Sequence, residues 1–149
     1  MIMEEIYTLE EALASLNAEQ AQELAAMVDK YGEEEAASHW LDEVAAKQLP
    51  ITPYSGNIGG ENEEPKSFSA RVKEQLDRLI CGAPEYEEER KKILEKGSFF
   101  TLSAASIAAA WLGGMFGITA GAIAPGIVLI LRVVGKVGIN AYCANKNID

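Results

Sequence analysis

Apolar residues recur at spacings of three and four along most of this chain, which is the period of an α-helix. The pattern predicts helices over residues 8–31, with a break near Asn17, and over 33–48, 67–81 and 84–96. No segment alternates apolar and polar positions convincingly, so we expect no β-sheet. The sequence therefore predicts an all-α fold, a small helical bundle that carries an apolar helical hairpin at about 98–143.

Residues 49–66 interrupt the helical pattern with three prolines, three glycines and a cluster of acids. Such a segment cannot bury enough apolar area to offset the entropy lost on ordering. We expect a flexible linker there, between an acidic helical module (1–48) and a helical unit (67–149) that contains the hairpin. Cleavage of an exposed linker by a protease would release the C-terminal unit.

The longest apolar feature is the run from Gly97 to Leu131, 35 residues without a charged side chain in a chain that is 24% charged. That length suffices to cross a bilayer once, or to enter it as a short helical pair. Basic residues flank the run on both sides, among them Lys91 and Lys92 before it and Arg132 and Lys136 after it.

If both basic flanks obey the positive-inside rule, they lie on the same side of a membrane. This favours a hairpin that turns near Gly113–Gly114 or Gly117, with arms of about 15–18 residues. The alternative is one span from about 100 to 123. Pro125 would then break or restart the helix, and a second helix over 126–143 would present Arg132 and Lys136 on the far side.

Small residues recur every fourth position within the run, at Ala105, Ala109, Gly113, Gly117 and Gly121. On a continuous helix they would share one face and let a second helix approach closely, within or between subunits. Large apolar side chains, including Trp111 and Phe116, occupy the other faces, where they would meet lipid or neighbouring helices. Three glycines in a helix exposed to water cost about 1 kcal/mol each, which favours an apolar environment.

Charge is distributed unevenly along the chain. Residues 1–96 carry 22 acidic and 10 basic side chains, whereas residues 97–149 carry one acidic and three basic ones, for a total of −10. No basic stripe offsets the repulsion from phosphates, so we expect no nucleic-acid partner. The acidic module would keep the apolar part soluble or bind a regulatory protein, with Trp40 as the anchoring residue of that contact.

The two cysteines and the first residues of the chain indicate in which cellular compartment the protein is expected. Cys81 and Cys143 could form one disulfide, but no disulfide framework of a secreted protein is present, so we expect two reduced thiols in a reducing compartment. The first residues lack the basic and apolar regions of a signal peptide. We therefore expect the N-terminal part to stay cytoplasmic.

Motifs for catalysis or cofactor binding are missing from the sequence. His39 is the one histidine, and together with Glu43 it would supply two metal ligands, which are too few for a site. The glycines at Gly113, Gly114 and Gly117 are not followed by the Lys and Ser/Thr of a phosphate loop. We expect no enzyme activity, no cofactor and no metal.

The last part of the chain resembles a group of small bacterial proteins of unassigned function. The resemblance rests on Ile127–Cys143, which ends VGKVGINAYC after a Gly/Ala-rich run, and on the motifs LICGAP (79–84) and YEEER (86–90). Several members of that group are encoded beside stress or phage-defence genes. The resemblance implies a membrane-acting effector and carries over no functional residues.

These observations lead to two hypotheses. The first is a non-enzymatic membrane-acting protein, a pore-forming or depolarising effector in bacterial stress or phage defence. It would act on membrane lipid together with further copies of itself, and it would be cytoplasmic with inner-membrane association through the C-terminal segment. The second is a soluble helical interaction module or complex subunit, in which the apolar hairpin is the core or an oligomer seam.

Overall fold

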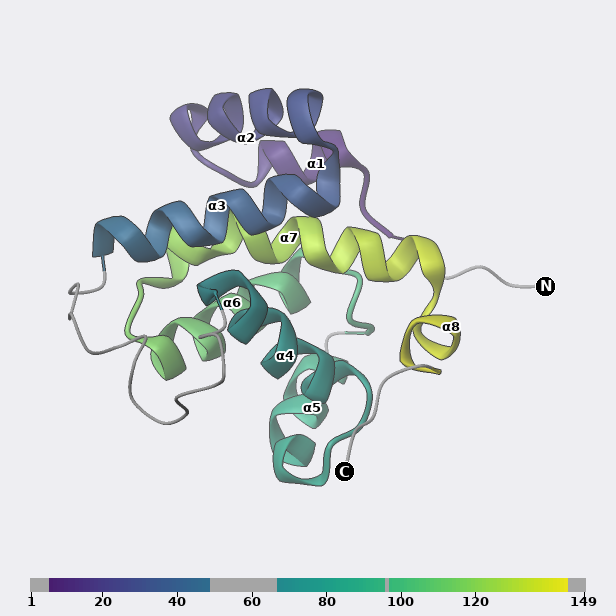
Figure 1. Ribbon diagram of the computed structural model, residues 1–149. Coiled ribbons are helices and arrows are strands. Elements are labelled where there is room, and N and C mark those ends of the chain that lie inside the picture. Colours follow the sequence, from purple (N-terminus) through teal and green to yellow (C-terminus); the bar gives the residue numbers. More distant parts are fainter. Residues whose placement is uncertain (1–5, 49–66, 96, 145–149) are drawn as a thin grey trace.

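The computed structural model describes residues 6–48, 67–95 and 97–144, and it is all-α within these ranges (Figure 1). The elements are α1 (Leu9–Ala14), α2 (Ala18–Tyr31), α3 (Glu33–Gln48), α4 (Phe68–Ile80), the 3-10 turn η1 (Pro84–Tyr86), α5 (Glu87–Leu94), α6 (Leu102–Phe116), α7 (Ala120–Val137) and α8 (Ile139–Cys143). No strand occurs in the described residues, so the predicted small helical bundle is confirmed. The predicted linker, 49–66, lies outside the described residues.

Local sequence signals set the helix ends. Five helices begin after a residue whose side chain accepts a hydrogen bond from the backbone N–H three positions on: Thr8, Asn17, Ser67, Thr101 and Thr119. Gly32 and Gly117, both with positive φ, end α2 and α6. The predicted break near Asn17 is confirmed by its cap.

Helix α7 is the central element of the bundle, packed between α3 and α6. Figure 1 shows α1 and α2 beyond α3 on one side of α7, and α4, α5 and α6 on the other. The five residues from Ile127 to Leu131 are at most 5% exposed. One apolar core includes residues from before the predicted linker, such as Leu41, and from after it, such as Leu76. The helices on the two sides of 49–66 thus share a single core.

Helices α6 and α7 form the hairpin, and its turn is at Gly117, one of the two positions that the sequence predicted. The backbone N–H groups of Gly117 and Ile118 both donate to the carbonyl of Gly113, at 2.8 and 2.9 Å. A Cβ on Gly113 would clash with the carbonyl oxygen of Ile118, so the turn requires glycine there. A single helix over 100–123 is absent from this fold.

The expectation that Pro125 breaks the helix is wrong. Pro125 lies inside α7, which runs from Ala120 to Val137. Because proline has no N–H, the carbonyl of Gly121, four residues earlier, loses its helical partner. The helix expected over 126–143 instead ends at Val137, where Gly138 at φ 94° separates α7 from α8.

The expectation of two reduced thiols is also wrong, because Cys81 and Cys143 form a disulfide. Cys81 caps the end of α4, and Cys143 is the last residue of α8. Folding brings their Cα atoms to 5.6 Å although 62 residues separate them along the chain, a proximity that cysteine spacing alone does not reveal. The cysteines therefore give no support for a reducing compartment.

Candidate functional site

The candidate site is the hairpin formed by α6 and α7, together with the side chains that attach it to the rest of the bundle. Of the predicted ladder of small residues, Ala105, Ala109 and Gly113 lie on the buried face of α6. Gly117 is in the turn and Gly121 is in the first turn of α7, and both are exposed. The five residues therefore do not share one helix face, because the helix ends after the third of them.

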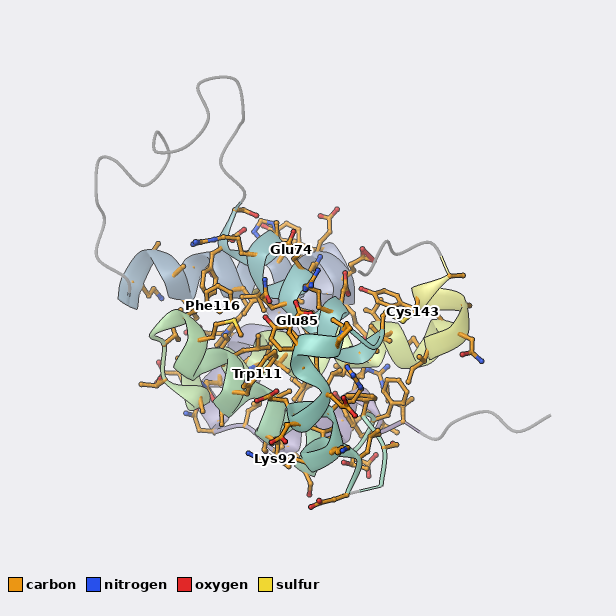
Figure 2. All side chains as sticks on the ribbon, turned by 90° about the horizontal axis from the view of Figure 1, so that it is seen from below. Glu74, Glu85, Lys92, Trp111, Phe116 and Cys143 are labelled. Carbon is orange, nitrogen blue, oxygen red and sulfur yellow. A yellow bond between two sulfur atoms is a disulfide. The ribbon has the colours of Figure 1, made fainter. Side chains whose placement is uncertain are left out.

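The two large aromatic residues predicted on α6 contact other parts of this chain (Figure 2). The Trp111 ring meets the ring of Tyr86 edge-on, with 4.8 Å between centroids. The Phe116 ring meets that of Phe68 in the same way at 5.3 Å. Both side chains are half-buried, so each covers part of the seam between α6 and the α4–η1 segment.

The outward face of α6 is lined by small, uncharged side chains. Its exposed positions include Ser103, Ser106, Ala110 and Gly114, spaced three, four and four residues apart. Neither the buried nor the exposed face of α6 carries a charge. The hairpin therefore presents no ionised side chain between Leu102 and Leu131.

A first attachment lies beside Pro125 and comes from α2 and α3. The amide nitrogen of Gln20 donates to the carbonyl of Gly121 at 2.9 Å, which replaces the partner that Pro125 removes. The indole N–H of Trp40 donates to the carbonyl of Ala122 at 2.9 Å. Trp40 is only 7% exposed. The prediction that Trp40 binds another protein is thus corrected for this conformation, because the indole is buried against α7.

A second attachment, the Glu33 cluster, consists of Tyr7, Glu33, Arg132 and Lys136. The Arg132 guanidinium makes two bonds to the Glu33 carboxylate, at 2.7 and 3.2 Å, and Lys136 Nζ lies 2.7 Å from it. Arg132 also donates to the carbonyl of Tyr7, whose hydroxyl donates to the carbonyl of Val128, both at 2.7 Å.

The Arg132 side chain is 11% exposed and that of Glu33 is 15% exposed. Arg132 and Lys136, the predicted basic flank, both pair with Glu33 in the first turn of α3. A cation on an apolar helix needs a partner when it is buried, so the sequence signalled that a partner exists. It did not signal that Glu33, nearly 100 positions earlier, supplies the carboxylate.

The electrostatics of the Glu33 cluster favour its charged form. Burial by itself would raise the pKa of Glu33, but the hydrogen bonds and positive charges of Arg132 and Lys136 outweigh it and hold the pKa below its ordinary value. Burial raises the pKa of Tyr7, so its hydroxyl stays protonated and donates to Val128. The cluster is thus an intact ion pair at neutral pH.

A third attachment joins α8 to α4. Besides the disulfide, the Tyr142 hydroxyl donates to the carboxylate of Asp77. Burial, followed by this hydrogen bond, raises the pKa of Tyr142. Beside the pair is a cavity of about 150 Å³, which is lined by Glu34, Lys73, Asp77, Ile130, Val133, Val134 and Tyr142. Its apolar lining comes from α7.

Among the described residues, no group of three His, Cys, Asp or Glu side chains is placed to hold a metal ion. In the same part of the chain, α7 is the one helix long and apolar enough to cross a membrane by length and composition. More than half of its residues are buried, as in the core helix of a soluble bundle.

In comparisons with known proteins, no family model, no curated protein and no solved structure matches the chain. The functional interpretation therefore rests on the geometry described above. The resemblance to small bacterial proteins with a Gly/Ala-rich C-terminal segment stays a prediction.

Proposed function

We propose that this protein is a non-enzymatic membrane-acting protein, a helical bundle that stores an uncharged hairpin and delivers it to a lipid bilayer. One observation carries the proposal. The α6–α7 hairpin contains the central helix of the bundle, is uncharged from Leu102 to Leu131, and bears its cations, Arg132 and Lys136, only near its open end.

The dimensions of the hairpin are compatible with entry into a bilayer. At 1.5 Å per residue, the 15 residues of α6 span about 22 Å and the 18 of α7 about 27 Å. A hydrocarbon core is about 30 Å thick, so α6 reaches most of the way across, and the uncharged part of α7, residues 120–131, covers about 18 Å of it. Since the arms are antiparallel, the basic open end would remain on the side from which the hairpin enters, as the positive-inside rule favours.

Release of the hairpin requires α1, α2 and α3 to leave α7. Lipid can replace the apolar contacts of these helices, but it cannot replace the ion pair between Glu33 and Arg132. Acid weakens that pair by protonating Glu33, and it also reduces the net charge of −10 that repels an anionic membrane. Acidic pH is therefore the expected trigger.

The test uses vesicles of phosphatidylethanolamine and phosphatidylglycerol loaded with a fluorescent dye. We expect the full chain to float with the vesicles and release dye below about pH 4, where carboxylates with a lowered pKa, such as Glu33, gain protons, and not at neutral pH. Ala110→Lys places a charge at the middle of α6, which costs about 3 kcal/mol at the centre of a bilayer, so dye release should fall at least tenfold.

Ser103→Lys is the matched control, because it adds the same charge at the open end of the hairpin, where the bilayer interface tolerates it. Both positions are exposed in the bundle, so thermal melts of the two variants should agree with wild type. Equal dye release by wild type and Ala110→Lys would show that α6 does not enter the bilayer. No flotation at any pH would end the proposal.

A second candidate function, a soluble interaction module with the hairpin as its core, is favoured by the burial of α7. Residues Ile123, Ile127 and Leu129 are each 0% exposed, so the surrounding helices already cover this face. Hydrogen exchange distinguishes the two functions. Amides of α2 and α3 that stay protected in the presence of vesicles at acidic pH would favour the module. Their loss of protection, with the amides of 120–137 still protected by the bilayer, would favour membrane entry.

A pore would need several copies of the hairpin, so we infer self-assembly on the membrane. Regulation by a protein that binds the acidic N-terminal helices, inner-membrane association and a role in bacterial stress or phage defence stay predictions from the sequence.

A further inference from the structure

We propose that the Cys81–Cys143 disulfide is a redox-controlled clasp. Its reduction would free α8 and uncover the C-terminal half of α7, which makes the release of the hairpin responsive to the thiol state of the surroundings. This inference rests on the proposed function, since it names a control on the same hairpin.

Apart from the disulfide, α8 is weakly held. It has five residues, none of them buried, and is far shorter than a helix that is stable on its own. Ile139, Tyr142 and Cys143 are half-buried at the edge of the core, and the Tyr142 hydroxyl donates to Asp77 on α4. The link at Cys143 thus adds a covalent restraint to these non-covalent contacts.

The joint between α7 and α8 allows α8 to turn away. Gly138 links the two helices at φ 94°, a backbone conformation that glycine adopts without strain. A change in φ or ψ at this one residue reorients α8 while α7 stays intact. The clasp therefore has a hinge at one end and the disulfide at the other.

What α8 covers is partly apolar. Tyr142 lines the 150 Å³ cavity together with Ile130, Val133 and Val134 of α7, and the charged residues Glu34, Lys73 and Asp77 complete the lining. Departure of Tyr142 would widen this cavity and expose the α7 residues further. The opened surface would continue to Val137, which is already 53% exposed, and would form an apolar strip along the last turns of α7.

The chemistry is thiol–disulfide exchange with an external dithiol. A thiolate of the dithiol attacks one sulfur of the disulfide, forms a mixed disulfide and expels the other cysteine as a thiolate. The second thiol of the reductant then displaces the protein sulfur. Two electrons pass to the protein, which gains two thiols, and the dithiol becomes a disulfide. Cys81 and Cys143 are both partly exposed, so the reductant can reach them.

The test compares the oxidised full chain with the same protein after treatment with dithiothreitol, at neutral pH. Hydrogen exchange measured by mass spectrometry should accelerate at least about tenfold more in 133–143 than in 20–30 of α2 after reduction, because a local opening of α8 adds to the general loss of stability. A variant with both Cys81→Ser and Cys143→Ser should match the reduced wild type and should not respond to dithiothreitol.

Unchanged exchange in 133–143 would overturn the clasp, as would a uniform rise over the whole chain, which would indicate global unfolding. Because the first comparison uses wild-type protein only, it does not depend on the folding of the serine variant. Dye release from the vesicles described above is measured on the same samples after they are transferred to the acidic pH at which release is expected. Release that is equal in both redox states would refute the clasp alone, whereas absence of release in both would refute the membrane function.

Discussion

At the scale of single residues, Gly126 determines how closely α7 approaches α3. A Cβ at this position would lie 2.6 Å from Cγ and 2.7 Å from Cδ2 of Leu41. Leu41 is 0% exposed and is enclosed by the core, so it cannot move aside at low cost. The absence of one methyl group therefore sets the contact between the N-terminal helices and the hairpin.

Gly126→Ala should destabilise the protein by about 1–3 kcal/mol through overpacking, although alanine is the better helix former. Gly114→Ala is the matched control, because a Cβ there meets nothing within 4 Å and the position is exposed. We expect this control to be stabilised by up to about 1 kcal/mol. Urea unfolding monitored by circular dichroism measures both changes. Stabilisation by both substitutions would contradict the close contact with Leu41.

The Glu33 cluster should make the stability of the fold depend on pH, and the direction of that dependence follows from the pKa of Glu33. Because the pKa of Glu33 is lower in the folded protein, its contribution is complete above its unfolded pKa of about 4.3 and is lost as pH falls through the folded value. Glu33→Gln should cost about 2 kcal/mol at neutral pH, the range for hydrogen bonds to charged groups. The difference from wild type should shrink progressively below about pH 4.

Unfolding free energies measured at a series of pH values test this expectation. The matched control is Glu35→Gln, which lies in the same first turn of α3 with its side chain exposed. It should change stability by less than about 0.5 kcal/mol. A Glu33→Gln deficit that stays constant with pH would rule out the ion pair as its cause.

At the scale of elements, the helical period located α2, α3 and α4 closely. α2 and α4 are amphipathic and have side-chain caps, and α3 begins after Gly32 with three acidic residues in its first turn. The helical period could not predict that α7 continues through Pro125, because this depends on hydrogen-bond donors from α2 and α3. Gln20 supplies the hydrogen bond that Pro125 removes from Gly121, and Trp40 binds the adjacent carbonyl. A proline that would stop an isolated helix is accommodated once these side chains are in place.

Trp40→Phe should therefore destabilise the bundle by about 1 kcal/mol, because the carbonyl of Ala122 loses the indole donor while an aromatic ring still fills the buried position. Hydrogen exchange should rise in the first two turns of α7. Trp111→Phe is the control, since the Trp111 ring packs against Tyr86 at the half-buried surface and should lose less than about 0.5 kcal/mol. Equal losses in the two variants would argue against the role of the indole N–H.

At the scale of the whole molecule, the disulfide closes a long loop around the hairpin. Linking residues 62 positions apart restricts the unfolded chain and should stabilise the fold by about 4 kcal/mol in the chain-entropy model. Reduction should therefore lower the free energy of unfolding by about 2–4 kcal/mol, as measured by urea titration with and without dithiothreitol. An unchanged unfolding midpoint would contradict this expectation.

The sequence could not predict which residues, far apart along the chain, pair with each other in the site. The uncharged run and the Gly117 turn depend on neighbouring residues, so the pattern of the chain contains them. The pairs Cys81–Cys143 and Glu33–Arg132 depend on how α4 meets α8 and how α3 meets α7, and this is decided by packing across the core. For the same reason Trp40, an apolar residue on a predicted helix face, could not be assigned to α7 rather than to a partner.

The closed loop also has a topological consequence. Two bonded cysteines must occupy the same aqueous compartment, so the chain between Cys81 and Cys143 can traverse a bilayer only an even number of times. While the bond persists, a lone traverse by α6 is forbidden unless α7 returns through the membrane beside it. While the disulfide is intact, the segment between the two cysteines can therefore cross the bilayer only in pairs of passes. Once the disulfide is reduced, the segment can also cross an odd number of times.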